Sequence, residues 1–122
     1  MVEIATSDRR EADLLRGVLD LSVLALVATA PGHAYEIVDR LRACGFDSTG
    51  YGTIYPLVTR LRRQGLLVRE AVASPEGPHR NVLTITSEGH AALTEWRSRW
   101  DHATAAVTSV LAGFDRMGAS DG

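Results

Sequence analysis

The side chains best suited to chemistry in this sequence are its arginines. The 122 residues include 13 arginines and no lysine, and residues 40–80 contain seven arginines but only three acidic residues. This middle third therefore has a local excess of four positive charges. A guanidinium group is planar and donates paired hydrogen bonds to a phosphate or to the edge of a guanine. A GC-rich genome also favours arginine, so the position of the cluster matters more than the lack of lysine.

The other reactive side chains form no catalytic or metal-binding pattern. The four histidines, at positions 33, 79, 90 and 102, belong to different predicted elements, and Cys44 is the only cysteine. No zinc-protease, serine-hydrolase or phosphate-loop motif occurs. We therefore expect no metal site, no cofactor and no enzymatic activity.

Length and composition predict one folded domain in the cytoplasm. The chain has 45% hydrophobic and 23% charged residues, as ordinary globular proteins do. A single cysteine excludes a disulfide scaffold, the first ten residues do not resemble a secretion signal, and the apolar run at 18–30 is too short to span a bilayer. The net charge of -2 argues against a surface that binds polyanions all over.

Apolar spacing predicts three short helices in the first half of the chain. They are expected at residues 13–28, 34–43 and 51–64, with apolar residues at i, i+3, i+4 and i+7 in the second and third. Pro56 is expected in the first turn of the third helix, where a missing N–H costs nothing. The opposite face of that helix is cationic and hydroxylated.

A β-hairpin and a long helix are expected to follow. Two β-branched stretches at 66–73 and 80–85 flank a turn at 74–79, which predicts a hairpin with a wide, exposed tip. Thr86 or Ser87 is suited to cap the helix that begins next.

The final helix has the most regular pattern in the sequence. Apolar residues repeat at alternating spacings of three and four over three heptads, at Leu93, Trp96, Trp100, Ala103, Val107, Val110 and Phe114. We call these seven residues the heptad seam. Polar residues separate them, so the helix has a narrow apolar stripe and is expected to pair with the same helix of a second chain.

This order of elements is typical of a winged helix-turn-helix protein. We expect an α+β, mostly helical fold with a flexible lead-in at 1–12 and a DNA-binding domain at 13–86. A coiled-coil-like dimerisation helix at 87–115 and a frayed tail at 116–122 complete the prediction. In this fold the third helix enters the major groove and the hairpin touches the flanking backbone or the minor groove. The excess arginine falls on the third helix and hairpin, which favours double-stranded DNA as the partner.

Several segments resemble the PadR-type bacterial transcriptional regulators. The similar segments are Leu15-Arg16-Gly17-Val18-Leu19-Asp20-Leu21, Gly32-His33-Ala34-Tyr35-Glu36-Ile37, Gly52-Thr53-Ile54-Tyr55-Pro56-Leu57 with Gly65-Leu66-Leu67, and Gly77-Pro78 with Arg80 and residues 83–89. The resemblance covers residues 14–115 and implies a homodimeric repressor of the short subclass, with one C-terminal dimerisation helix. Ala34 replaces a glycine that is usual in that family. Val82 and Leu83 stand where aromatic residues are common.

The candidate DNA contacts lie on the second helix, the third helix and the hairpin. They are Tyr35, Thr53, Tyr55, Thr59, Arg60, Arg62, Arg63 and Arg80. Several have a structural alternative at this stage: the tyrosines as core aromatics, Thr53 as a helix cap, and Arg60, Arg62 and Arg63 as a solvated face.

Two tryptophans one turn apart raise the question of a ligand. Trp96 and Trp100 belong to the heptad seam and are ordinary interface residues on that ground alone. The resemblance implies that small members of the family bind flat aromatic compounds beside the dimerisation helices, so a small aromatic effector is a candidate ligand of these two residues.

The overall hypothesis is a ligand-responsive repressor that binds a pseudo-palindromic operator as a homodimer. Two alternatives remain open. One is a winged-helix module that binds an acidic protein, and the other is a small-molecule carrier without sequence-specific DNA binding.

Overall fold

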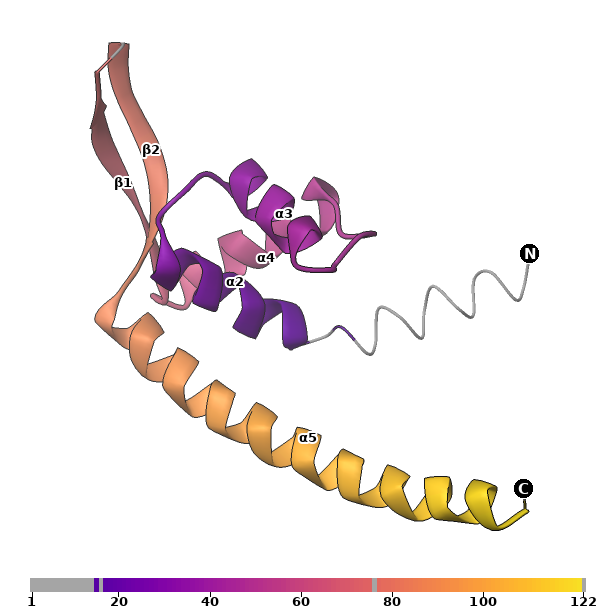
Figure 1. Ribbon diagram of the computed structural model, residues 1–122. Helices are drawn as coiled ribbons and strands as arrows, with labels where there is room; N and C mark the ends of the chain where they lie inside the picture. The colour runs from indigo at the N-terminus through magenta and orange to yellow at the C-terminus, as the bar shows by residue number, and fades with distance from the viewer. Residues whose placement is uncertain (1–14, 16, 76, 122) are drawn as a thin grey trace.

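The computed structural model describes residues 15, 17–75 and 77–121 and has the predicted order of elements (Figure 1). The elements are α2 (Val18–Thr29), α3 (Ala34–Ala43), α4 (Tyr51–Arg63), β1 (Leu67–Ser74), β2 (Gly77–Ile85) and α5 (Ser87–Asp121). The α+β, mostly helical winged fold is confirmed. The expected lead-in at residues 1–12 lies outside the described residues.

The core lies where α2, α3 and α4 pack against one another and against the base of the hairpin. Its most deeply buried side chains are Val23, Leu24, Val27, Ile37, Leu41, Ile54 and Leu61. Leu67 and Leu83 extend the same cluster from the two strands. Each such burial contributes about 1.5–3 kcal/mol. The helical spacing of apolar residues thus identified the correct faces of α3 and α4.

The first predicted helix is interrupted near its start. We expected it from residue 13, and residues 13, 14 and 16 lie outside the described part of the chain. Leu15 is helical, but α2 begins only at Val18 because Gly17 has a φ of 81°. Only glycine adopts this left-handed conformation readily, and it interrupts a right-handed helix. The Gly17 carbonyl accepts the Leu21 N–H at 3.1 Å, so helical hydrogen bonding starts there.

The placement of Pro56 was also wrong. Helix α4 has Gly50 as its N-cap and begins at Tyr51, so Pro56 is its sixth residue and lies beyond the first turn. The helix accommodates the missing N–H there, at the cost of the bond that the Gly52 carbonyl would otherwise accept. Thr53 lies inside the helix and is exposed, so the alternative role of Thr53 as the N-cap of this helix is wrong.

The hairpin is longer than expected and its tip is tighter. Antiparallel pairing runs from Leu67 opposite Ile85 to Ser74 opposite Gly77, with one irregularity between Val72 and Ser74. The predicted wide turn at 74–79 therefore belongs largely to the ladder. An isolated bridge joins Gly32 to Leu83, with N···O distances of 2.8 and 3.3 Å, and ties the α2–α3 loop to β2.

A close joint connects the winged domain to α5. The Thr86 hydroxyl accepts the Gly89 N–H at 2.9 Å, which confirms Thr86 as the cap, and donates to the Gly65 carbonyl at 2.6 Å. Gly89 packs so tightly that an added Cβ would overlap the Leu66 carbonyl oxygen and lie 2.6 Å from Cγ1 of Ile85. The direction in which α5 leaves the domain is fixed by these contacts.

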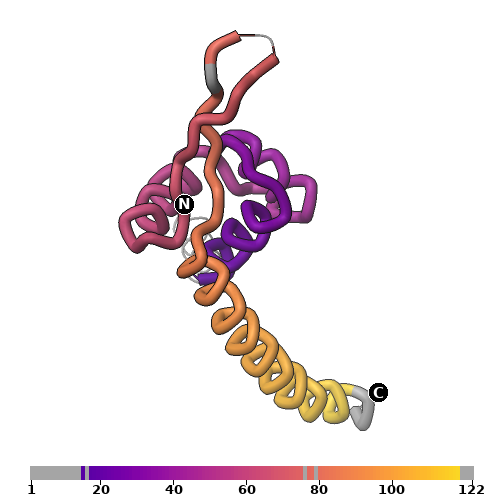
Figure 2. The backbone as a smooth tube through the Cα atoms, turned by 90° about the vertical axis from the view of Figure 1, so that its left-hand side faces the viewer, coloured from indigo at the N-terminus to yellow at the C-terminus, as the bar shows by residue number. Residues whose placement is uncertain are grey.

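Helix α5 packs against α2 near its start and then extends away from the domain (Figure 2). It continues to Asp121, so residues 116–121, which we expected to be frayed, are helical. Arg116, Met117 and Ala119 are good helix formers, whereas Gly118, Ser120 and Asp121 are not, so propensity alone does not account for this length. Within the described ranges, no helix is both long enough and apolar enough to cross a membrane.

Candidate nucleic-acid interface

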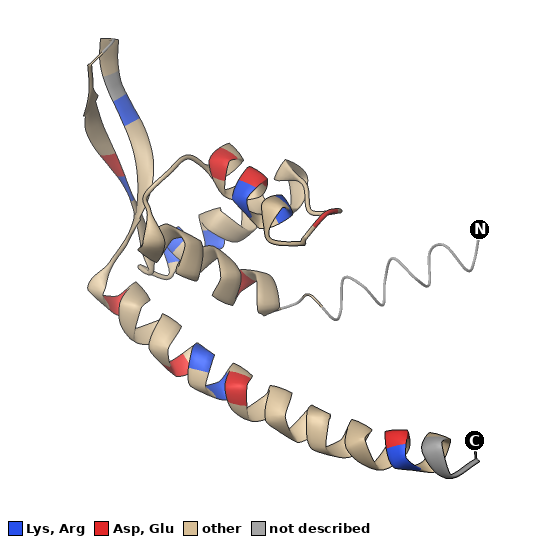
Figure 3. Cartoon of the chain, in the orientation of Figure 1, with Lys and Arg blue, Asp and Glu red and all other residues tan. Residues whose placement is uncertain are grey.

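Helix α4 presents a polar, cationic face on the side opposite to the core. Arginines occur on both α4 and the hairpin (Figure 3). The buried face consists of Ile54, Leu57, Val58 and Leu61. Among the predicted contacts on the other face, Thr53, Tyr55, Arg60 and Arg63 are exposed, and Thr59 and Arg62 are half-buried. Amphipathic spacing alone accounts for this division.

The tyrosines are surface residues. Tyr35 on α3 is 57% exposed and Tyr55 on α4 is 46% exposed, so the alternative of core aromatics was wrong. Tyr35 stacks on His33 with ring centroids 5.2 Å apart, and Tyr55 stacks on Tyr51 at 5.3 Å. Both rings are therefore held in place while their edges face solvent.

Arg60 has an acidic partner within the domain. Its Nη2 atom lies 2.7 Å from Oδ1 of Asp20, and this ion pair ties α4 to α2. The side chain of Arg60 remains 52% exposed, whereas that of Asp20 is 19% exposed. A DNA phosphate would have to compete with Asp20 for this guanidinium group.

Arg80, which lies on β2 opposite Val72, is held in a similar way. Its Nη2 atom donates to Oε1 of Glu36 at 3.0 Å, and its Nε atom donates to Nε2 of His33 at 3.2 Å. The same Glu36 oxygen accepts the backbone N–H of His33 at 3.1 Å, which caps α3. Arg80 therefore connects β2 to the N-terminus of α3.

Two more arginines of the central cluster bond to backbone carbonyls. Arg40 donates to the carbonyls of Leu26 at 2.7 Å and Ala30 at 2.9 Å, which satisfies the C-terminal end of α2. Arg42 donates to the Thr49 carbonyl at 2.8 Å and holds the loop before α4. These two side chains stabilise the fold.

Three arginines of the cluster are left: Arg62, Arg63 and Arg69. Within the part of the chain that the structure describes, none of the three has an ion-pair or hydrogen-bond partner. Counting charges along the sequence therefore overstated the free positive charge, because four of the seven arginines are engaged inside the domain.

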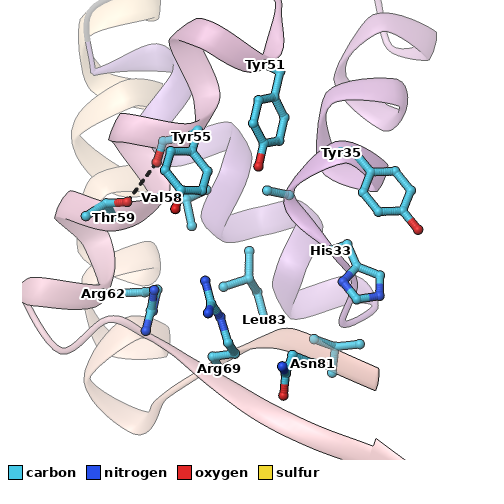
Figure 4. Close-up of a pocket in the computed structure, with 12 residues that line it drawn as sticks. His33, Tyr35, Tyr51, Tyr55, Val58, Thr59, Arg62, Arg69, Asn81 and Leu83 are labelled. Atoms are coloured by element: carbon cyan, nitrogen blue, oxygen red, sulfur yellow. Dashed lines mark hydrogen bonds between the residues drawn. The ribbon is translucent and has the colours of Figure 1, made fainter. Parts of the chain in front are cut away.

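A pocket of about 150 Å³ opens between α4, the start of α3 and the hairpin (Figure 4). Its lining residues are His33, Ala34, Tyr35, Tyr51, Tyr55, Val58, Thr59, Arg62, Arg69, Asn81, Val82 and Leu83. Arg69 points into the pocket from the strand side and Tyr51 points into it from the helix side, whereas the hydroxyl of Tyr35 points outward. The pocket brings together Tyr55, Thr59 and Arg62 of the predicted contacts.

The sequence analysis missed His33, Tyr51, Arg69 and Asn81 as site residues. Tyr51 precedes Tyr55 by four positions and therefore shares its helical face. Arg69 follows buried Leu67 by two positions and therefore faces the same side of the sheet. The helical and strand spacings in the sequence could therefore have predicted Tyr51 and Arg69 as site residues. His33 and Asn81 come near the pocket only through the tertiary fold.

The heptad seam changes character along α5. Leu93 and Trp96 are half-buried against the core of their own domain. Beyond them the seam is open, with exposed fractions of 45% at Trp100, 57% at Val107, 74% at Val110 and 70% at Phe114, and Ala103 is also exposed. Leu111 and Met117, which the sequence analysis missed, add to this surface.

The remaining reactive side chains form no cluster. No group of three or more histidine, cysteine or acidic side chains that could hold a metal ion occurs among the described residues. Cys44 is exposed at the end of α3.

Solved structures of bacterial regulators share this fold. A PadR-like transcriptional regulator from Bacillus cereus is 30% identical, with a TM-score of 0.75 over 81% of this chain and 96% of that one. A Streptococcus transcriptional regulator is 33% identical, with a TM-score of 0.73 over 80% of this chain and 95% of its own. A PadR family transcriptional regulator from Eggerthella lenta is 29% identical, with a TM-score of 0.73 over 91% of this chain and 96% of that one.

The sequence comparison agrees with the structural one. No curated protein is similar enough in sequence to count as a match. Residues 23–95, more than half of the chain, match the family described as "Transcriptional regulator PadR-like family". This segment includes α3, α4 and the whole hairpin, where the pocket and the cationic face lie. The chain therefore belongs to the PadR-like family of transcriptional regulators.

Proposed function

We propose that this regulator binds duplex DNA with α4 in the major groove and with the β1–β2 hairpin against the adjacent backbone. The observation that supports this most strongly is that Arg62, Arg63 and Arg69 line one hollow between α4 and β1 and have no ionic or hydrogen-bond partner among the described residues. Thr53 and Tyr55 add hydroxyl donors from the same helix, whereas the Thr59 hydroxyl donates to the Tyr55 carbonyl at 3.0 Å. Phosphate contacts of this kind position a protein on the duplex, while groups in the groove read the bases.

The proposed active species is a homodimer joined through α5. Residues 102–114 of this helix contain no arginine, aspartate or glutamate and include the exposed part of the seam. Apolar side chains that repeat along such a helix are stable in water when they pack against a second copy. A two-fold dimer would place the two α4 helices in successive major grooves, about 10 base pairs apart, on a pseudo-palindromic site.

A repressor that responds to a small aromatic effector is the finer form of the proposal. Trp100 is 45% exposed and Trp96 is half-buried where α5 leaves the domain, so a dimer would bring two pairs of indoles near its axis. Flat aromatic compounds stack on such rings. The effector would release DNA only if it bound the DNA-free dimer geometry more tightly than the DNA-bound one.

The experiment that tests this function is a competition gel shift. Labelled DNA from upstream of the encoding gene is bound by the wild-type protein and challenged with unlabelled copies of itself or with random duplex DNA of equal length. We expect the upstream DNA to compete at least about a thousandfold better, which is the lower end of the usual ratio of specific to non-specific binding.

The two alternative functions give different outcomes in the same experiment. A protein-interaction module would bind both DNAs weakly and equally. A small-molecule carrier would bind neither, while its tryptophan fluorescence would still respond to an aromatic compound. Equal competition by random DNA would therefore contradict the proposed regulator.

A further inference from the structure

We propose that the pocket between α4 and the hairpin holds one phosphodiester group of the DNA backbone, with Arg62 and Arg69 as its two cationic ligands. The inference rests on the proposed DNA-binding function and goes beyond it, because it assigns a specific ligand to a defined cavity. It also pairs Arg69, which lies on the wing, with Arg62 of α4 on a single phosphate.

The charge of the pocket suits an anion. Arg62 and Arg69 come from different elements, and neither has an ionic or hydrogen-bond partner in the described part of the chain. None of the twelve lining residues is an aspartate or a glutamate. The two guanidinium groups therefore repel each other with no internal counter-charge at the pocket, and a bound phosphate would relieve that repulsion.

Neutral donors complete the site. Tyr51 and Tyr55 supply hydroxyl groups from α4, and Asn81 supplies a side-chain amide from β2 (Figure 4). The stacking of Tyr51 on Tyr55, with ring centroids 5.3 Å apart, restricts both rings. Donors held in place before binding lose little conformational entropy when the anion arrives.

The size of the pocket suits a small anion. Its volume is about 150 Å³, below the roughly 300–1,000 Å³ of pockets that hold drug-sized ligands. A phosphate group with little associated water fits this space.

A phosphate bound in this pocket would connect the recognition helix α4 to the wing. Arg62 lies in the last turn of α4, next to buried Leu61, and Arg69 lies opposite buried Leu83 in the ladder. Both side chains therefore project from rigid elements. A phosphate between them would fix the distance of the wing from the recognition helix and thereby the register of the domain on the duplex.

The test compares the variants Arg62→Gln and Arg69→Gln with Arg116→Gln. The control removes the same charge near the far end of α5, well away from the pocket. DNA affinity is measured from 50 to 200 mM salt on the site located by footprinting. We expect each pocket variant to bind about tenfold more weakly and to reduce the slope of log K against log[salt] by about 0.9, with no change for the control.

A second measurement locates the phosphate. Duplexes in which one phosphate at a time is replaced by an uncharged methylphosphonate are bound by wild type and by Arg69→Gln. We expect one position in each half-site at which the methylphosphonate weakens binding by wild type but not by Arg69→Gln. At every other position the substitution should weaken binding by both proteins equally. Circular dichroism checks that the variants are folded, and Arg69→Lys, which keeps the charge, should restore most of the slope.

Three results would overturn the inference. If Arg62→Gln and Arg69→Gln are folded and bind DNA with the wild-type affinity and salt slope, the pocket does not contact DNA, while the proposed function stands. If Arg69→Gln abolishes binding of inorganic phosphate by the DNA-free protein but leaves the slope unchanged, the pocket takes a free anion. If wild type binds no duplex at all, the proposed function fails and this inference fails with it.

Discussion

The central arginines differ in what surrounds each of them. Arg60 and Arg80 meet carboxylates at 2.7 and 3.0 Å, whereas Arg62 and Arg69 face an open pocket. Asp20 lies 40 positions from Arg60 in the sequence, and no local pattern links the two. The sequence shows that each of these positions carries an arginine, but whether its guanidinium group is available to a ligand depends on tertiary contacts.

Asp20 is expected to restrain Arg60. The substitution Asp20→Asn removes the ion pair between α2 and α4 and should lower the free energy of unfolding by about 0.2–1 kcal/mol, since the Arg60 side of the pair is half exposed to solvent. It should also strengthen DNA binding, because Arg60 becomes free to reach a phosphate. Urea denaturation and gel shifts measure the two effects.

Asp39→Asn is the matched control for this substitution. Asp39 is an exposed acidic residue on α3, and no ion pair is recorded for it among the described residues. Its loss should change the free energy of unfolding little. If Asp20→Asn instead weakens DNA binding as much as Arg60→Gln does, then Asp20 orients Arg60 toward DNA and does not compete for it.

At the scale of elements, the sequence predicted helices by their faces and failed where the backbone departs from regular geometry. Helix α3 begins and ends at 34 and 43 as expected, because its apolar spacing is regular and Pro31-Gly32 precedes it. Gly17 interrupts the first predicted helix near its start through its positive φ, and the hairpin extends beyond its β-branched residues. Pairing between strands stabilises residues of low strand propensity, which a single-strand pattern does not reveal.

The joint between the hairpin and α5 is expected to tolerate no side chain at Gly89. The substitution Gly89→Ala would force the new Cβ into the Leu66 carbonyl oxygen and should lower the free energy of unfolding by about 1–3 kcal/mol. Urea denaturation followed by circular dichroism measures the change.

Gly113→Ala provides the comparison on the same helix. The nearest atom to a Cβ at Gly113 is Nη2 of Arg116 at 3.7 Å, so the alanine fits. Its higher helix propensity should raise the free energy of unfolding by up to about 1 kcal/mol. Equal effects of the two substitutions would mean that the close approach at Gly89 is absent in solution.

At the scale of the whole molecule, α5 projects from the winged domain with most of its apolar seam uncovered (Figure 2). The heptad spacing predicted this helix and its apolar stripe from the sequence. It did not reveal that Leu93 and Trp96 pack partly against their own domain, because the position of the domain beside the helix depends on the Thr86 joint. The proposed dimer therefore uses mainly the part of the seam beyond Trp96.

A charge in the open seam should separate the proposed dimer. Val107 is 57% exposed in the single chain, so Val107→Asp should leave the fold of the winged domain unchanged. In a dimer it would bury two unpaired carboxylates and should weaken association at least about a hundredfold. Sedimentation velocity measures the change. Thr108→Asp, off the seam, should remain dimeric, and a Val107→Asp variant that sediments as a dimer would contradict the assigned interface.

The most direct test of how this regulator engages DNA is a hydroxyl-radical footprint of the wild-type protein on its upstream site. We predict two protected patches on one face of the duplex, with centres about 10 base pairs apart, as two α4 helices held by a two-fold dimer require. A single protected patch, or protection spread evenly along the DNA, would contradict the account.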